Sequence, residues 1–237
     1  MKVVLLAGGF GTRAYPFTAS LPKPMMPVGG RPIIRHVMDI YAAQGFDHFV
    51  VSVGYLKEII IDYFDGRDLG FKVDIIDTGE DADTGDRIFR LREHLTEPFM
   101  ATYSDGLCDV DLKMLKAYHE GHSGSVTLTT VPLRSQYGTV LFDDTGAVSQ
   151  FLEKPVLPQH RINAGYLVMD PSAFDHWDGA SLEQDVLPKM AAKDQVFAYA
   201  HDGFFKSMDT FKDQTELEKL MNQPTAPWMQ SNKEEVA

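Results

Sequence analysis

The chain has 237 residues, of which 44% are hydrophobic and 24% are charged. These values are typical of globular proteins and exclude collagen-like, disordered and coiled-coil classes. Its 22 basic and 34 acidic residues give a formal charge of −12, which argues against a broad nucleic-acid-binding surface. The single cysteine, Cys108, excludes an intramolecular disulfide and a multi-cysteine metal site, and we expect it to be a small buried apolar residue.

The basic residues are unevenly distributed along the chain. Residues 1–38 carry +5 and contain no acid, whereas the other 199 residues, with 17 basic against 34 acidic side chains, carry −17. The N-terminal segment is a candidate anion-binding region, with chance clustering of solvated side chains as the alternative. No apolar run approaches the ~18 to 20 residues of a membrane span, and no signal-peptide pattern is present, so we expect a cytoplasmic protein without membrane contact.

The first half of the chain alternates between strand and helix patterns. The apolar run 3–7 precedes glycines, as in a buried parallel strand, and Pro32 opens a helical pattern that ends near Gly45. Further strands are predicted at 49–53, 72–76 and 99–103, and further helices at 56–64, 87–94 and 112–122. This alternation predicts a doubly wound, mostly parallel α/β sheet with right-handed crossovers.

After residue 122 the strand patterns lie closer together. Strands at 126–131, 139–142 and 148–152, with turn residues at 143–146, predict a small inserted antiparallel layer that contacts a substrate. Strands at 165–169 and 196–200 and helices at 182–192 and 210–221 complete the pattern. No linker separates the halves, so we expect one domain over 1–237, with a polar tail at 223–237 that wraps loosely or frays.

A glycine-rich loop follows the first predicted strand. Gly8, Gly9 and Gly11 would let backbone N–H groups approach a phosphate, with a simple tight turn as the alternative. Residues 9–14 also fit a dinucleotide-binding fingerprint, but the prolines at 16, 22, 24 and 27 prevent the helix that this fingerprint requires. The acidic residue that it requires about 20 positions further on is also missing, and Arg31 and Arg35 occupy that region instead. What remains is a proline-stiffened loop whose Arg13 and Lys23 suit polyphosphate oxygens.

Two aspartates occupy positions from which they could contact such a ligand. Asp105 follows the strand predicted at 99–103, at the sheet edge where open α/β sheets bind ligands, and Asp209 precedes the last long helix. The alternatives are a turn residue for Asp105 and a helix N-cap for Asp209.

Several short runs resemble the sugar-phosphate nucleotidyltransferases. The runs LAGGFGTR at 6–13 and PKPM at 22–25 resemble the signature of that family. Within this family the chain resembles the glucose-1-phosphate cytidylyltransferases over nearly its whole length. The runs that carry this resemblance are IDTG at 76–79, TGDR at 84–87, YSDG at 103–106, EKP at 153–155, NAG at 163–165, MDT at 208–210 and APW at 226–228. The resemblance implies a Rossmann-like, GT-A-type sheet, with a nucleotide-binding half at 1–122 and an acceptor-binding half at 123–222.

The resemblance also implies a reaction, in which CTP and a sugar 1-phosphate give a CDP-sugar and pyrophosphate. It assigns catalysis to Arg13, Lys23, Asp105 and Asp209, with both aspartates as ligands of Mg²⁺. Arg13 would stabilise the phosphates and the departing pyrophosphate, and Lys23 would hold the α-phosphate in line. The implied nucleotide-binding residues are Ala7, Gly8, Gly9, Gly11, Thr12, Arg13, Lys23, Thr84, Arg87 and Ser104.

The implied acceptor site comes from the second half of the chain. By resemblance, Glu153 accepts sugar hydroxyls, Lys154 contacts the sugar phosphate and Asn163 matches the sugar-binding asparagine of the family. Gly165 and Lys206 complete the expected acceptor-binding set. The alternative for Glu153 and Lys154 is a solvated charged turn before proline.

Three motifs differ from the family pattern and leave the substrate open. Asp86 and Ser104 each replace a glycine, and FKS at 205–207 replaces Trp-Gln-Pro, so Lys206 suggests an acceptor with extra negative charge or a different sugar. The rival hypotheses are another base or acceptor, such as heptose 1-phosphate or a non-sugar phosphate or phosphonate, and a non-catalytic nucleotide sensor. A homo-oligomer is a further hypothesis, although the segment between Tyr63 and Asp74 is shorter than in these relatives.

Overall fold

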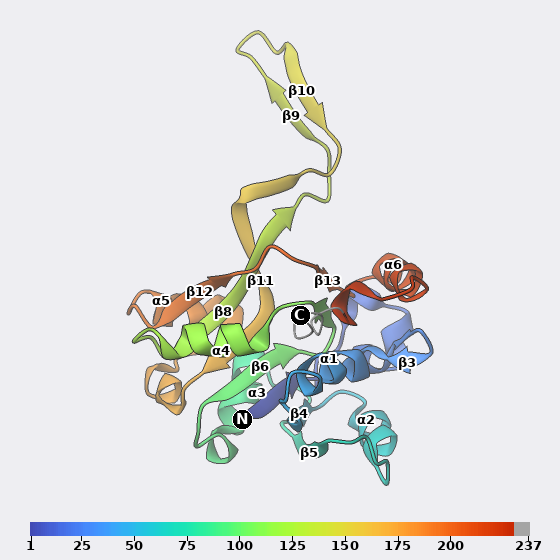
Figure 1. Cartoon of the computed structure of the whole chain (residues 1–237), viewed down its shortest axis with the longest axis vertical. Helices are drawn as coiled ribbons and strands as arrows, with labels where there is room; N and C mark the ends of the chain where they lie inside the picture. The colour runs from blue at the N-terminus through green and yellow to red at the C-terminus, as the bar shows by residue number, and fades with distance from the viewer. Residues whose placement is uncertain (230–237) are drawn as a thin grey trace, which may run out of the picture.

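A seven-stranded sheet forms the centre of the computed structural model, which describes residues 1–229 (Figure 1). The strand order is β12-β8-β11-β6-β1-β4-β5. β1 pairs in parallel with β4 and β6, whereas β11 runs antiparallel to β6 and β8. The mostly parallel sheet predicted from the sequence is confirmed. Its strands are β1 (Lys2–Leu6), β4 (His48–Val53), β5 (Lys72–Asp77), β6 (Phe99–Tyr103), β8 (Val126–Arg134), β11 (Val156–Met169) and β12 (Val196–Ala200).

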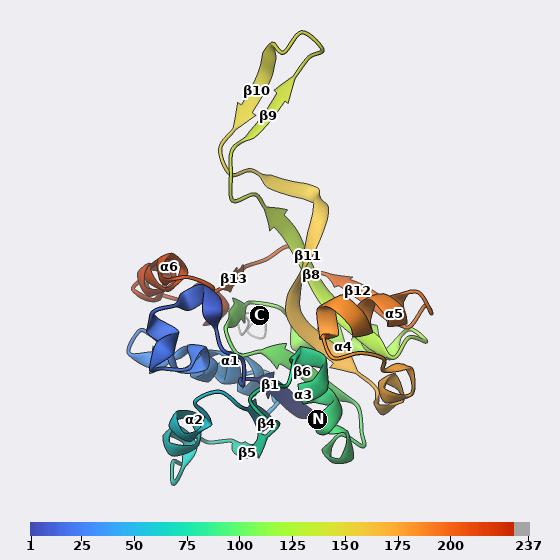
Figure 2. The same cartoon turned by 180° about the vertical axis from the view of Figure 1, so that it is seen from behind.

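β1 is buried on both faces because successive side chains of a strand point to opposite sides of the sheet. Val3 and Leu5 belong to one hydrophobic core, and Val4 and Leu6 to the other. The first core receives side chains from α1 (Ile33–Ala42), α2 (Lys57–Phe64), α4 (Leu112–Glu120) and α6 (Phe211–Met221). The second core receives them from α3 (Thr84–Arg90) and α5 (Leu187–Ala191), on the opposite side (Figure 2).

One predicted helix is divided in the structure. The segment predicted as a helix at 182–192 begins as a π-helix, Leu182–Val186, and continues as α5. The hydroxyl of Ser181 caps its start by accepting from the Gln184 amide at 3.3 Å. Pro188 lies in the first turn of α5 and has no N–H to donate, so the regular α-helical pattern starts afresh there.

The strands predicted at 139–142 and 148–152 are present, but they form a ribbon that projects from the body of the molecule (Figure 1). β9 (Thr139–Phe142) and β10 (Val148–Leu152) pair with each other in a separate two-stranded sheet. We call residues 135–155, which contain this ribbon, the arm. The predicted antiparallel pairing is present, but residues 140–154 of this extension are all exposed.

The C-terminal segment is anchored. Ala226 and Trp228 are 2% and 1% exposed, and the Trp228 ring lies against His36 of α1 and against Phe204. The expectation of a loose tail is therefore wrong for residues 226–228, and residues 230–237 lie outside the described chain. Among residues 1–229, no helix has both the length and the apolar character needed to cross a membrane.

Candidate active site

A cavity of about 680 Å³ lies at the carboxyl ends of β1 and β6. This edge of an α/β sheet is where ligands bind, because loops rather than strands close it. Most of the residues predicted to bind the nucleotide line the cavity. They are Ala7, Gly8, Gly9, Gly11, Arg13, Lys23, Thr84, Arg87 and Ser104.

The glycines of the loop after β1 are required by their surroundings. A Cβ on Gly8 would lie 2.1 Å from Nη1 of Arg87, and Gly11 has a φ of 62°, in the left-handed region. Gly9 is exposed and would meet open space. The loop backbone is therefore held at Gly8 and accessible to a ligand at Gly9.

Arg87 ties the Gly8 carbonyl of this loop to residues 78 and 79, which follow β5. Its guanidinium donates to Gly8 O at 2.8 Å, Gly79 O at 2.9 Å and Thr78 Oγ1 at 2.9 Å, and the residue is 3% exposed. Burial lowers the pKa of Arg87 from its ordinary value. These bonds occupy the guanidinium that was predicted to meet nucleotide phosphates, so in this structure Arg87 positions the glycine loop.

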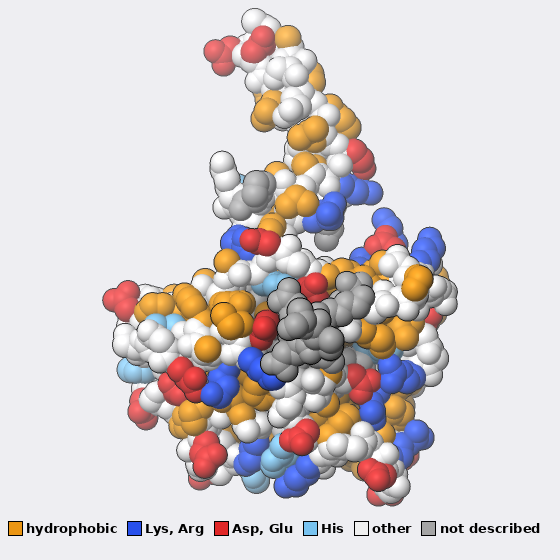
Figure 3. Space-filling model, viewed as in Figure 1, with side chains coloured by type: hydrophobic (Ala, Val, Ile, Leu, Met, Phe, Trp, Pro, Cys, Tyr) orange, Lys and Arg blue, Asp and Glu red, His pale blue; other side chains and the backbone are white. Residues whose placement is uncertain are grey.

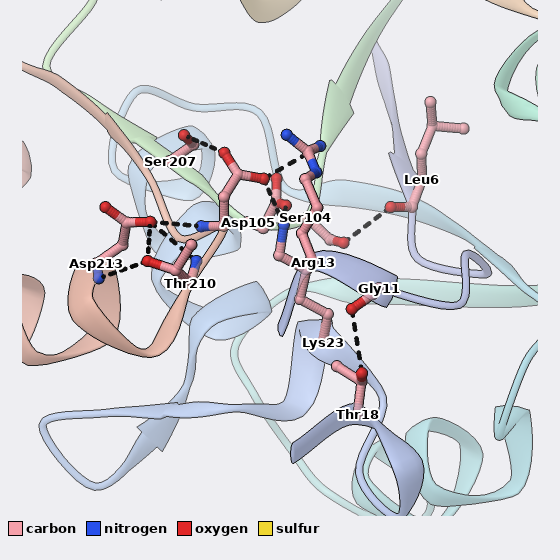
Figure 4. A network of polar contacts seen from close by, with 11 residues as sticks. Leu6, Gly11, Arg13, Thr18, Lys23, Ser104, Asp105, Ser207, Thr210 and Asp213 are labelled. Atoms are coloured by element: carbon pink, nitrogen blue, oxygen red, sulfur yellow. Dashed lines mark hydrogen bonds and ion pairs between the residues drawn. The ribbon is translucent and has the colours of Figure 1, made fainter. Parts of the chain in front are cut away.

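Two aspartates converge on one lysine at the floor of the cavity (Figure 4). The ammonium of Lys23 contacts both Asp105 and Asp209, with 2.9 Å between Nζ and Oδ1 of Asp209. Arg13 extends from the loop to the same Asp209 oxygen at 3.1 Å. All four residues predicted to be catalytic are therefore in one ion-pair cluster.

The convergence follows from a short strand pair. β7 (Gly106–Cys108) pairs antiparallel with β13 (Phe205–Ser207), so that Ser207 lies opposite Gly106. Asp105 and Asp209 flank this pairing, and the Met208 amide donates to Asp105 O at 2.9 Å. The hydroxyl of Ser207 also donates to Oδ2 of Asp209 at 2.8 Å, which fixes that carboxylate.

Contacts within the cluster shift the pKa values of Lys23 and Asp209. Burial alone would lower the pKa of Lys23, but the carboxylates of Asp105 and Asp209 outweigh it and raise that pKa above its ordinary value. Burial opposes ionisation of Asp209 as well, yet Lys23, the Ser207 hydroxyl and Arg13 hold its pKa below the usual range. At neutral pH Asp209 is therefore a carboxylate and Lys23 an ammonium.

A second carboxylate network lines the cavity and was not predicted. Glu183, from the π-helix, accepts from the Tyr103 hydroxyl and from Thr84 Oγ1 at 2.7 Å. Burial and the nearby Glu183 charge raise the pKa of Tyr103 well above its ordinary range. Asn163, predicted to bind the acceptor, lies in the same lining. No local pattern marks Glu183, because the start of the helix predicted at 182–192 carries no indication that this helix end faces the cavity.

Five of the predicted site residues do not line the cavity. Glu153 and Lys154 lie in the arm and pair with each other at 3.6 Å. Lys206 pairs with Asp213 at 3.2 Å and Glu216 at 2.7 Å, so its charge is already neutralised away from the cavity. The others are Thr12, which is exposed in a 3-10 turn, and Gly165, whose φ is 76° and whose Cβ would overlap the ring of Tyr103.

A further group of potential metal ligands lies outside the cavity lining. Ligand atoms of Cys108, Asp109 and His201 lie within 4.8 Å of one another. Burial raises the pKa of the Cys108 thiol to about 12, and Oδ1 of Asp109 already accepts from His201 and from the Phe204 amide at 2.7 Å each. We regard this group as a structural hydrogen-bond cluster, with Cys108 buried as expected.

Residues 2–213 match the nucleotidyl transferase family. The chain belongs to this family. It is 35% identical to the glucose-1-phosphate cytidylyltransferase of Salmonella typhi, over 96% of this chain and 98% of that protein. It is 30% identical to the mannose-1-phosphate guanylyltransferase catalytic subunit beta of Xenopus tropicalis, over 90% of this chain and 62% of that protein. Among solved structures, HddC from Yersinia pseudotuberculosis superposes with a TM-score of 0.72 at 25% identity, covering 92% of this chain and 98% of that one.

Membership of this family confirms the enzyme class and the fold predicted from the sequence. The protein is a nucleotidyltransferase. The hypothesis of a non-catalytic sensor is set aside accordingly.

Proposed function

We propose that the protein couples CTP to a sugar 1-phosphate, releasing pyrophosphate and forming a CDP-sugar. The observation that carries the proposal is the cluster of Arg13, Lys23, Asp105 and Asp209 beside the glycine loop, in a cavity of about 680 Å³. Such a cluster offers both cations for phosphate oxygens and carboxylates for a metal ion at one point.

The reaction needs no protein nucleophile. A phosphate oxygen of the sugar 1-phosphate attacks the α-phosphorus of CTP, and the bond from that phosphorus to the bridging oxygen of the β-phosphate breaks. Because the attacker is already an anion at neutral pH, the barrier is set by positioning two anions and stabilising the transition state. Lys23 would hold the α-phosphate in line, and Arg13, which is exposed at the cavity rim, would close on the departing pyrophosphate.

The residues present fit a divalent cation. Asp105 and Asp209 already direct oxygens at one shared cation, the Lys23 ammonium, and carboxylate oxygen is the ligand that Mg²⁺ prefers. Mg²⁺ held by these two residues would neutralise phosphate charge and polarise the phosphorus. Lys23 would then be free to turn from the aspartates to the nucleotide.

Cytosine is the preferred base, with guanine as the rival. The preference rests on the motif resemblance and on the 35% identity to an enzyme named for cytidylyl transfer, whereas the guanylyltransferase relative is 30% identical. For the acceptor, Asn163, Tyr103 and Glu183 supply polar groups for sugar hydroxyls. A cytoplasmic location stays a prediction.

Pyrophosphate release tests the proposal. The purified protein is incubated with Mg²⁺ and each of CTP, GTP, UTP and dTTP, crossed with glucose, mannose and heptose 1-phosphates. We expect CTP with glucose 1-phosphate to give the highest kcat/KM. A higher kcat/KM with GTP would overturn the base assignment. If none of the three sugar phosphates supported pyrophosphate release, the sugar assignment would be overturned.

A further inference from the structure

Two aromatic rings join the N-terminal loop to α6. Phe17 comes from the loop that carries Arg13, and Phe211 is the first residue of α6. Their ring centroids are 5.0 Å apart with 12° between the ring planes, and the two residues are 45% and 55% exposed. Figure 3 shows exposed apolar side chains over α6 beside charged ones. Neither ring belongs to a hydrophobic core, so what this pair provides is a contact between the loop and the helix.

The ring pair acts in parallel with the ion pair between Arg13 and Asp209. Arg13 lies four residues before Phe17, and Asp209 lies two residues before Phe211, so both contacts connect the same two segments. Arg13 is 76% exposed, and an exposed ion pair shifts an equilibrium by only about 1- to 5-fold. A stacked aromatic pair contributes roughly 2- to 12-fold beyond the area that it buries. When Arg13 turns from Asp209 to a phosphate, the rings still join the loop to α6.

The loop couples the position of Phe17 to that of Arg13. These two residues lie in successive 3-10 turns. The carbonyl of Gly11 connects the turns, because it accepts from the Ala14 amide at 2.9 Å and from Thr18 Oγ1 at 3.1 Å, the second bond being drawn in Figure 4. A displacement of Phe17 away from α6 would therefore move Arg13 as well.

The start of α6 is the fixed side of this contact. The hydroxyl of Thr210 accepts from the Asp213 amide at 3.3 Å, and Oδ2 of Asp213 accepts from the Thr210 amide at 2.9 Å, so the first turn of the helix is capped. One residue further on, the Gln214 side chain donates to the carbonyl of Pro27 at 2.8 Å. Phe211 therefore lies in a turn that is held both within the helix and against the N-terminal segment.

We propose that Phe17 and Phe211 are positioning residues that hold Arg13 at the cavity, within reach of the β- and γ-phosphates of the nucleotide. The inference rests on the phosphate contact of Arg13 in the proposed function. A loop that α6 already holds does not have to be ordered when a phosphate ligand arrives. A loop released from α6 would reach its binding position in only a fraction of the molecules, and its apparent affinity would fall by that fraction.

Calorimetric binding of pyrophosphate with Mg²⁺ to the full chain tests the inference, because this product contains neither base nor sugar. We expect Phe17→Ala and Phe211→Ala each to raise Kd about 2- to 12-fold, and the double variant to bind no more weakly, since either change removes the whole stack. Phe211→Tyr keeps the ring and should bind like the unaltered protein. Tyr118→Ala is the matched control and should leave Kd unchanged. Tyr118 is 41% exposed, and its ring lies 5.5 Å from that of Tyr199, outside the cavity lining.

The same change in an Arg13→Gln background separates positioning from a general structural effect. If the rings act through Arg13, Phe17→Ala should have no further effect on Kd in that background. Equal weakening in both backgrounds would overturn the inference, as would unchanged binding in both ring variants or weakening of the same size by Tyr118→Ala. Failure of the unaltered protein to bind pyrophosphate would overturn it too. A different base or sugar preference in turnover would overturn the proposed function and leave this result unaffected.

Discussion

Replacing Lys23 by methionine tests whether the two aspartates form a cation site. The Lys23 side chain is 11% exposed and its ammonium contacts both Asp105 and Asp209, which are 20% and 26% exposed. Removing one partner of a buried ion pair costs about 3 to 5 kcal/mol. Because water reaches the two carboxylates, the lower end applies, about 3 kcal/mol. In a chain of this size that corresponds to a loss of roughly 6 to 12 °C in Tm.

Lys206→Met is the matched control. Lys206 also lies between two carboxylates, Asp213 and Glu216, but outside the cavity lining. Thermal and urea unfolding at pH 7 should be recorded for both variants with and without Mg²⁺. We expect Mg²⁺ to restore much of the stability lost in Lys23→Met, because a divalent ion replaces the missing ammonium, and to restore none in Lys206→Met.

The kinetics of the same pair extend the test. Loss of a contact made in the transition state costs roughly 3 kcal/mol, so Lys23→Met should lower kcat/KM by about 10² to 10³. Lys206→Met should stay within about twofold of the parent, as for a side chain away from the substrates. The shared cation site would be refuted if the two variants lost equal stability and Mg²⁺ restored it in both. It would also be refuted if Mg²⁺ restored the stability of neither.

Three further results are expected. Arg87→Gln should lower stability by several kcal/mol, because the carbonyls of Gly8 and Gly79 and the Thr78 hydroxyl lose a buried donor, and urea unfolding measures this. The pKa of Asp209 is lower in the folded protein than in the unfolded chain, so its carboxylate stabilises the fold relative to Asp209→Asn. This extra stability should be complete above pH ~4, the ordinary pKa of an aspartate, and should be lost as the pH falls through the folded pKa. Acid unfolding of both proteins measures the difference. Glu183→Gln should raise KM for the acceptor more than KM for the nucleotide, in steady-state assays varying each substrate.

The N-terminal half of the site could be predicted from sequence because its chemistry is local. Gly8, Gly11, Arg13 and Lys23 lie within one loop, directly after a strand whose apolar run marks it as central. Even Asp105 is local in this sense, since it follows the apolar strand β6. Strand patterns predict where such loops emerge, and therefore which polar residues meet at one sheet edge.

The second half required contacts that no local pattern contains. The family resemblance predicted Glu153 and Lys154 at an acceptor site, but pairing of β9 with β10 carries both onto the arm. Lys206 was interpreted as a free cation because its partners, Asp213 and Glu216, lie seven and ten residues later in the sequence. They approach Lys206 only once α6 has folded. The burial of Trp228 was not predicted, because most residues around it in the C-terminal segment are polar.

β11 gives the arm a direct mechanical connection to the interior. This single strand begins at Val156 beside the arm, passes Asn163 in the cavity wall and ends at Met169 within the sheet. The base of the arm and a residue of the cavity wall therefore belong to one continuous strand, which pairs with β8 on one side and with β6 on the other. A ligand bound at the base of the arm and a ligand bound beside Asn163 would contact the same strand.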